Sequence, residues 1–254
     1  MKEPFASSEE ISGEYSSFLQ LDFGCAVWSN RHFIAFACIA FMGGVLIAVI
    51  NNNPIHYAVA KLGGDSGGAL MLPDKNDALL ETLDAELSFI RIAAQNIQSG
   101  IHTFVLGISF GIGTLIMLII NGAAVGCMLL MLLNSSSSYE IAASIVAHAP
   151  MELIGLITCG AAGLRLGWGL IRAIASSSIW HLQVATLEAL CLACISTIML
   201  VTASGIEAFI SFSVHIPSAF KVVIGVVTIL TMLVCIQLSR LHWLRHGGQK
   251  LKSN

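Results

Sequence analysis

Residues 104–134 read FVLGISFGIGTLIMLIINGAAVGCMLLMLLN, an apolar run that is interrupted at Asn121-Gly122. A helix needs about 20 apolar residues to cross the hydrocarbon core of a bilayer. The run from Phe104 to Leu133 is too long for one crossing and short for two, and Asn-Gly is a turn-forming dipeptide. We therefore predict a hairpin or re-entrant element that turns at Asn121-Gly122 and holds a polar side chain near membrane depth.

The composition of the whole chain also indicates a protein that folds in a lipid bilayer. Hydrophobic residues make up 56% of the 254 residues and charged residues only 11%, and the mean hydropathy is +0.83. These values are typical of a membrane domain and not of a soluble globular one. The formal net charge of −3 gives no reason to expect nucleic-acid binding. The lipid bilayer is thus the first predicted partner, and no cofactor is indicated.

Apolar stretches of about crossing length recur on both sides of the opening run. They cover residues 33–50, 104–120, 123–133, 141–171, 185–203 and 219–238. The stretch 123–133 is too short to cross alone, so it either extends through Asn134–Ser138 or stops at mid-depth. We predict an all-α fold, a polytopic transmembrane helical bundle with about six membrane helices, the alternative being five plus a re-entrant element.

The placement of Lys and Arg predicts the orientation. Cytoplasmic segments are enriched in basic residues, and the end of the chain carries Arg240, Arg245, Lys250 and Lys252. The C-terminus is therefore expected in the cytoplasm, and six crossings place the N-terminus there too. The predicted organisation is a cytoplasmic segment over 1–32, a membrane domain over 33–238 and a basic cytoplasmic tail over 239–254.

The long polar connection over 51–97 is expected outside the cytoplasm. Its first half has loop signals such as Asn53-Pro54 and Gly63-Gly64. Its second half repeats apolar residues at helical spacing, among them Leu83, Leu87 and Ile90, which predicts an amphipathic helix. Two interpretations remain open for this helix: packing on neighbouring membrane helices, or a docking surface for an extracytoplasmic partner.

Three glycine pairs have the GxxxG spacing within apolar sequence, which lets helix backbones approach closely. They are Gly107 with Gly111, Gly122 with Gly126, and Gly163 with Gly167. We expect helix-packing contacts inside the bundle, while an interface between copies of the chain in a homo-oligomer remains the alternative.

Polar residues in membrane segments are the best functional candidates, because burying them is costly. Five form the predicted intramembrane polar core: Asn121, His148, Glu152, Arg165 and Glu207. Pro150 disfavours helical geometry at the residue before it, so a helix is expected to start there. Glu152 would then complement the positive helix end, with His148 as a cap. The alternative is a proton- or ion-handling pair of His148 and Glu152 joined by Glu207.

The sequence contains no HExxH motif, no Gly-rich phosphate loop and no nucleophile elbow. The segment His148-Ala-Pro-Met-Glu152 lacks the second His of a zinc-protease helix. One His and two Glu on two segments also make a weak metal signal. We therefore expect no catalytic residue and no metal site, and we predict that the chain is not an enzyme.

Taken together, several motifs resemble the stage II sporulation protein M family of multi-pass membrane proteins. They include Asn96-Ile97, the glycines from Gly107 to Gly126, His148-Ala-Pro-Met-Glu152-Leu153, Gly160-Ala-Ala-Gly163-Leu-Arg-Leu-Gly167 and Gly205-Ile-Glu207-Ala-Phe209. The resemblance extends over roughly residues 33–238. Two positions depart from the family pattern: Ala149 replaces the usual Gly, and Ser211-Phe212 stands where Thr-Pro is usual.

The resemblance implies a multi-pass protein of the bacterial cytoplasmic (inner) membrane without known enzymatic activity. In spore formers, the family member assembles with cell-wall hydrolases at the engulfing membrane. The expected function is a non-enzymatic scaffold or regulator of a membrane or cell-envelope complex, with other membrane or envelope proteins as partners. The alternative is a small transporter or channel that uses the His/Glu polar core.

Overall fold

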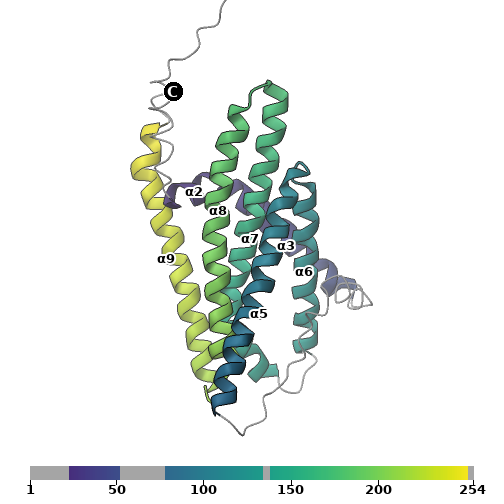
Figure 1. Cartoon of the computed structure of the whole chain (residues 1–254), viewed down its shortest axis with the longest axis vertical. Helices are drawn as coiled ribbons and strands as arrows, with labels where there is room; N and C mark the ends of the chain where they lie inside the picture. Colours follow the sequence, from purple (N-terminus) through teal and green to yellow (C-terminus); the bar gives the residue numbers. More distant parts are fainter. Residues whose placement is uncertain (1–22, 52–77, 134–137, 251–254) are drawn as a thin grey trace, which may run out of the picture.

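The structure, a computed structural model, describes residues 23–51, 78–133 and 138–250, and these residues form an all-α bundle without strands (Figure 1). The elements are α2 (Phe23–Ser29), α3 (Arg31–Asn51), α5 (Ala78–Val105), the 3₁₀ turn η1 (Leu106–Ile108), α6 (Ile112–Leu133), α7 (Ser138–Ser176), α8 (Trp180–Ile206), the π-helical turn η2 (Glu207–Ser211) and α9 (Ser218–Lys250). The predicted helical bundle is thus confirmed. The segments over 1–22, 52–77, 134–137 and 251–254 lie outside the described residues, with the sequence predictions made for them.

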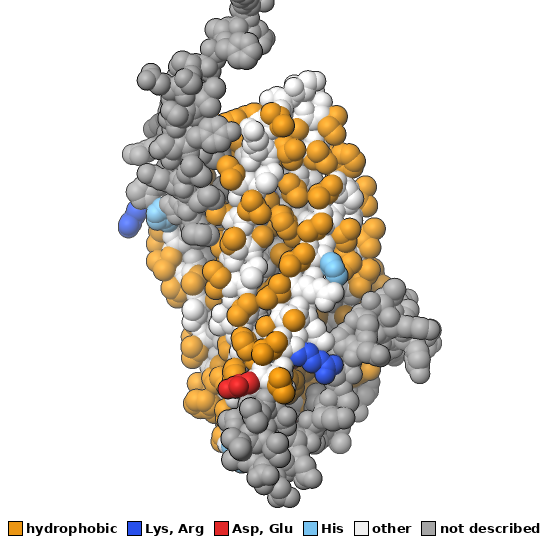
Figure 2. All heavy atoms as spheres, in the orientation of Figure 1, with side chains coloured by type: hydrophobic (Ala, Val, Ile, Leu, Met, Phe, Trp, Pro, Cys, Tyr) orange, Lys and Arg blue, Asp and Glu red, His pale blue; other side chains and the backbone are white. Residues whose placement is uncertain are grey.

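Five of the helices are long and apolar enough to cross a membrane: α3, α6, α7, α8 and α9. A sixth long helix, α5, packs beside α7 and α8 in the same bundle. Most of the coloured side chains on the face in Figure 2 are apolar, and few charged groups lie among them. Large apolar side chains exposed on an isolated protein are what a lipid-facing surface requires.

The turn predicted at Asn121-Gly122 is wrong, because α6 is a continuous helix from Ile112 to Leu133. The amide of Asn121 donates to the carbonyl oxygen of Met117 at 2.9 Å, one turn earlier, and its oxygen accepts from Ser99 of α5 at 3.3 Å. These bonds satisfy the polar side chain without breaking the helix.

The break in the apolar run lies instead between Val105 and Ile112. Phe110 and Gly111 have positive φ angles of 58° and 85°, which reverse the chain between α5 and α6. The hydroxyl of Ser109 donates to the carbonyl of Leu106 and accepts from the amide of Gly113 at 2.8 Å, which caps the start of α6. The chain therefore turns at Ser109-Phe110-Gly111 and not at Asn121-Gly122.

The face that α5 turns to its neighbours is its small and polar face. Leu87 and Ile90 are 66% and 63% exposed, whereas Ala93 and Thr103 are buried. Asn96 donates to the hydroxyl of Ser204 in α8 at 3.2 Å. Of the two interpretations left open for α5, this arrangement agrees with packing on neighbouring helices. The apolar stripe of α5, with Leu87 and Ile90, points away from those helices.

The helix start predicted near Pro150 is also wrong. Pro150 lies inside α7, which begins at Ser138, so Glu152 is not in a first turn. A proline within a helix leaves the carbonyl four residues earlier without its partner, here that of Val146. Gly225 of α9 packs directly against this carbonyl, where a Cβ atom would overlap it. Neighbouring helices make such interruptions tolerable in membrane helices.

The centre of the bundle is closely packed. Leu118, Ala161, Ala162, Ala189 and Leu192 are fully buried there and come from α6, α7 and α8. The predicted glycine pairs lie at close backbone contacts around this core: a Cβ at Gly122 would overlap the carbonyl of Phe41 in α3, one at Gly107 that of Gly163, and one at Gly167 the amide of Gly111.

The first and last described helices meet at one end of the bundle. The guanidinium of Arg31 lies 5.6 Å from the ring centroids of both Trp28, in α2, and Trp243, in α9. Arg240 of α9 lies over the Trp28 ring at 5.7 Å. Such cation–π contacts tie α2 across the end of α9.

Candidate functional site: a histidine and two glutamates

The start of α7, the end of α8 with η2, and the start of α9 meet at the lower end of the bundle in Figure 1. His148 and Glu152 lie one turn apart on the same face of α7. Glu207 begins η2, whose wide turn is closed by the amide of Phe212 donating to the carbonyl of Glu207 at 3.1 Å. Single π-helical turns occur frequently at functional sites.

The structure brings three of the five predicted polar-core residues together. Nε2 of His148 lies 3.9 Å from Oε2 of Glu152 and 3.8 Å from Oε2 of Glu207. The exposed fractions of the three side chains are 11%, 31% and 19%, in the order His148, Glu152 and Glu207. We refer to these three residues as the His/Glu triad.

The other ring nitrogen of His148 faces a different set of groups. Nδ1 lies 3.1 Å from the carbonyl oxygen of Ser144 and 2.9 Å from the hydroxyl of Ser211. The ammonium of Lys221, in α9, donates to the carbonyl of Ser211 at 2.7 Å and to the hydroxyl of Ser144 at 3.3 Å. Lys221 therefore holds in place the two serines that orient the imidazole.

Sequence reasoning missed Ser144, Ser211 and Lys221. Lys221 could have been identified from the sequence, because it is an ionisable residue at the edge of the apolar stretch 219–238. The two serines could not have been identified in this way, because Ser residues recur throughout the apolar segments and mostly bond to their own helix.

The two remaining polar-core residues are not with the triad. Asn121 bonds within α6 and to Ser99 of α5. Arg165 lies further along α7 and donates to Glu188 of α8 at 2.7 Å. Glu188, an acid inside an apolar stretch, is a second ionisable partner that the sequence reasoning passed over.

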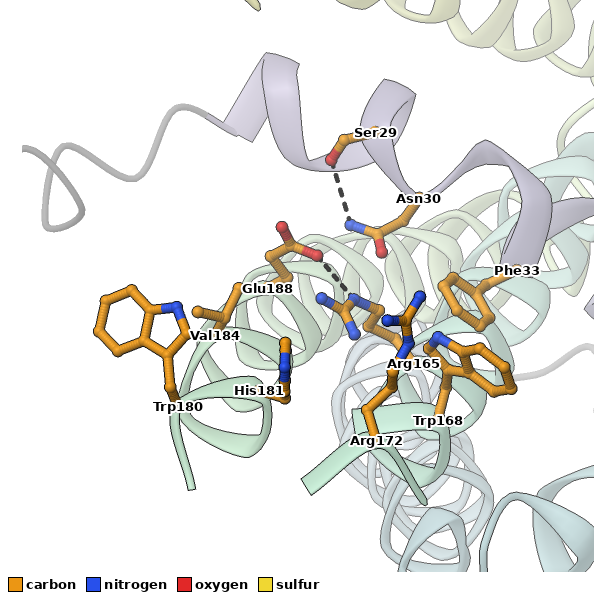
Figure 3. A pocket seen from close by; sticks show the side chains of 10 residues that line it. All are labelled: Ser29, Asn30, Phe33, Arg165, Trp168, Arg172, Trp180, His181, Val184 and Glu188. Atoms are coloured by element: carbon orange, nitrogen blue, oxygen red, sulfur yellow. Dashed lines mark hydrogen bonds and ion pairs between the residues drawn. The ribbon is translucent and has the colours of Figure 1, made fainter. Parts of the chain in front are cut away.

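Arg165 and Glu188 border a cavity of about 440 Å³ at the opposite end of the bundle. Figure 3 shows the side chains around it, which come from α2, α3, α7 and α8. Two aromatic contacts hold the arginines: Arg165 lies 5.8 Å from the Phe33 ring centroid and Arg172 lies 5.6 Å from that of Trp168. This end of the protein is basic and aromatic, as expected for a boundary between membrane and water.

The described residues thus contain two ends with clustered ionisable side chains, separated by a closely packed centre. Within the described part, no buried side-chain nitrogen or oxygen lacks a hydrogen-bond partner. The prediction of His148 as a helix cap and Glu152 at a helix start is wrong, since both lie within α7. What remains is a clustered imidazole and two carboxylates in a membrane helix bundle.

Comparison with known proteins agrees with this architecture. A family model described as Stage II sporulation protein M matches residues 32–212, the part that contains the His/Glu triad and the pair of Arg165 and Glu188. Comparisons with curated proteins and with solved structures give no match. Because the family match covers most of the chain and the structure has five helices able to cross a membrane, the chain belongs to the stage II sporulation protein M family of multi-pass membrane proteins.

Proposed function

We propose that this chain is a non-enzymatic scaffold or regulator of a membrane or cell-envelope complex. The observation that carries the proposal is the packed centre of the bundle. Leu118 and Leu192 are fully buried between the two polar ends, with small alanines around them. A permeation path through this conformation would have to displace close-packed side chains, which is costly, so the geometry favours a protein that holds partners over one that conducts.

The proposed location is the bacterial cytoplasmic membrane, with both termini in the cytoplasm. Among the described Lys and Arg residues, Arg31, Arg165, Arg172, Arg240 and Arg245 belong to the end of the bundle near α2 and the α7–α8 connection, whereas Arg91 and Lys221 belong to the other end. The excess of basic residues at the first end supports the proposal that this end faces the cytoplasm.

A small transporter or channel is the second candidate, and the His/Glu triad is the observation that favours it. Ionisable residues within membrane helices commonly mark ion or proton pathways. The side chain of Glu152 is 31% exposed, so the described residues do not cover it completely. A transporter of this kind would need a second conformation in which the central leucines separate.

Two assays on the full chain separate these functions. Under the scaffold proposal, gentle detergent extraction and mass spectrometry recover the same stoichiometric partners with wild type and with Glu152→Gln. Purified protein in sealed vesicles then shows no proton or cation flux above empty vesicles. Glu140→Gln, an exposed acid in the first turn of α7, is the matched control. Flux with wild type that is lost with Glu152→Gln and kept with Glu140→Gln would refute the scaffold proposal.

A further inference from the structure

The three ligand atoms of the His/Glu triad face a common point. Nε2 of His148 and one carboxylate oxygen from each glutamate all lie within 4.8 Å of one another. The separations of 3.8 and 3.9 Å from Nε2 exceed the 2.7–3.2 Å of an N–H···O hydrogen bond. The three side chains therefore converge without bonding directly to one another, which leaves room for an atom between them.

The partners of Nδ1 decide which ring nitrogen of His148 carries hydrogen. A carbonyl oxygen can only accept, so the contact of 3.1 Å between Nδ1 and Ser144 requires an N–H at Nδ1. In a neutral imidazole, Nε2 then presents its lone pair to Glu152 and Glu207. A backbone carbonyl on the second nitrogen is the usual way in which proteins orient a metal-binding histidine.

Charge balance points in the same direction. Two carboxylates at the edge of a hydrocarbon region are costly unless they are neutralised. The ammonium of Lys221 bonds to the two serines on the Nδ1 side of the imidazole. A divalent cation between the carboxylates cancels both charges and accepts the lone pair of Nε2.

We propose that His148, Glu152 and Glu207 form a binding site for a divalent first-row transition-metal ion. One imidazole and two carboxylates suit ions such as Zn²⁺, Mn²⁺ or Fe²⁺. With metal–ligand bonds of about 2.0–2.2 Å, neighbouring ligand atoms of a tetrahedral ion lie about 3.4 Å apart. The three ligand atoms lie within 4.8 Å of one another, so each separation must shorten by less than about 1.5 Å to reach this geometry. Three protein ligands leave a position for water or for a group from a partner protein.

The position of the triad along α7 places it near the membrane–water boundary. Trp168 and Trp180, at the basic end, are 45% and 39% exposed, as expected at a membrane–water boundary. His148 lies about 30 Å before Trp168 along the helix at 1.5 Å per residue, which matches the thickness of the hydrocarbon core. The triad is therefore close to the opposite boundary, where ions arrive from water.

The first test measures metal content directly. The full chain, purified in detergent without a polyhistidine tag, is stripped with a chelator, dialysed against Zn²⁺ and analysed by mass spectrometry. The expected result is a single Zn²⁺ bound per chain by wild type. Across a series of free Zn²⁺ concentrations, Glu207→Gln and His148→Gln should need at least about tenfold more Zn²⁺ to reach the same content. Glu140→Gln and His102→Gln, which replace exposed residues outside the triad, are the matched controls and should bind like wild type.

A second measurement needs only wild type and therefore does not depend on variants that fold. X-ray absorption of the zinc-loaded protein should show nitrogen and oxygen ligands at about 2.0–2.1 Å, including imidazole, and no sulfur at about 2.3 Å. A sulfur shell would assign the ion to cysteines such as Cys191 and Cys194, and would overturn the proposal. So would wild type that binds no ion, or triad variants that bind as tightly as the controls.

Discussion

Two adjacent glycines of α3 provide a sharp test of how the bundle is packed. A Cβ atom on Gly43 would meet no atom within 4 Å, whereas one on Gly44 would overlap the carbonyl oxygen of Ile119 and lie 2.9 Å from the amide nitrogen of Ala123. Gly44→Ala must therefore push α6 away from α3, and Gly43→Ala need not move anything.

The size of the effect follows from three terms. Both substitutions gain the same helix propensity, about 1 kcal/mol for Gly→Ala, so this term cancels between them. Overpacking at Gly44 costs about 1–3 kcal/mol. Separating the helices also loosens the neighbouring cluster of Ala48, Ala123 and Cys127. Gly44→Ala should therefore be less stable than Gly43→Ala by about 1–3 kcal/mol, with a thermal midpoint lower by roughly 2–12 °C.

The assay is the thermal loss of monodisperse protein in detergent, read by fluorescence-detected size exclusion for wild type and both variants. Gly43→Ala is expected at or above the midpoint of wild type. Equal midpoints for the two variants would show that α3 and α6 do not approach each other at Gly44, and the packing described here would be refuted.

Three further predictions concern other parts of the bundle. Ser196→Ala should lower stability by about 1 kcal/mol, because the hydroxyl donates to the carbonyl of Gly155 at 2.6 Å in a fully buried position; Thr202→Ala, at an exposed site, should have no measurable effect in the same thermal assay. Glu188→Gln should weaken the partly exposed contact with Arg165 by less than about 1 kcal/mol, and a larger loss of stability than Ser196→Ala gives would contradict this ranking. In a cysteine-free background, an impermeant thiol reagent added to intact cells should label Val214→Cys and not Ser177→Cys, and the reverse pattern would invert the proposed orientation.

Most of the fold could be predicted from hydropathy, because a bilayer restricts which segments can cross it. Helices that cross hydrocarbon must be long and apolar, so α3, α7, α8 and α9 could be located from composition alone. The boundaries around α6 could not, because an Asn-Gly pair resembles a turn unless its side chain has a partner. That partner, Ser99, is on another helix, and sequence spacing does not show it.

The membership of the candidate site was harder to predict, because it depends on packing between helices. His148 and Glu152 could be paired from their spacing of four residues, once α7 is known to run through Pro150. Grouping Glu207 with them rested on its character as an ionisable residue in a membrane segment. Arg165 is also an ionisable residue in a membrane segment, but it lies at the other end of the bundle, where it forms an ion pair with Glu188.

The contact between α2 and α9 has a consequence for how the protein is made. Arg240, which lies over the Trp28 ring of α2, and Trp243, which contacts Arg31 at the start of α3, are near the end of the last described helix. Since a chain is synthesised from its N-terminus, α2 is made before the residues of α9 that contact it. This end of the bundle therefore closes only after α9 has been translated, and until then Trp28 lacks its contact with Arg240.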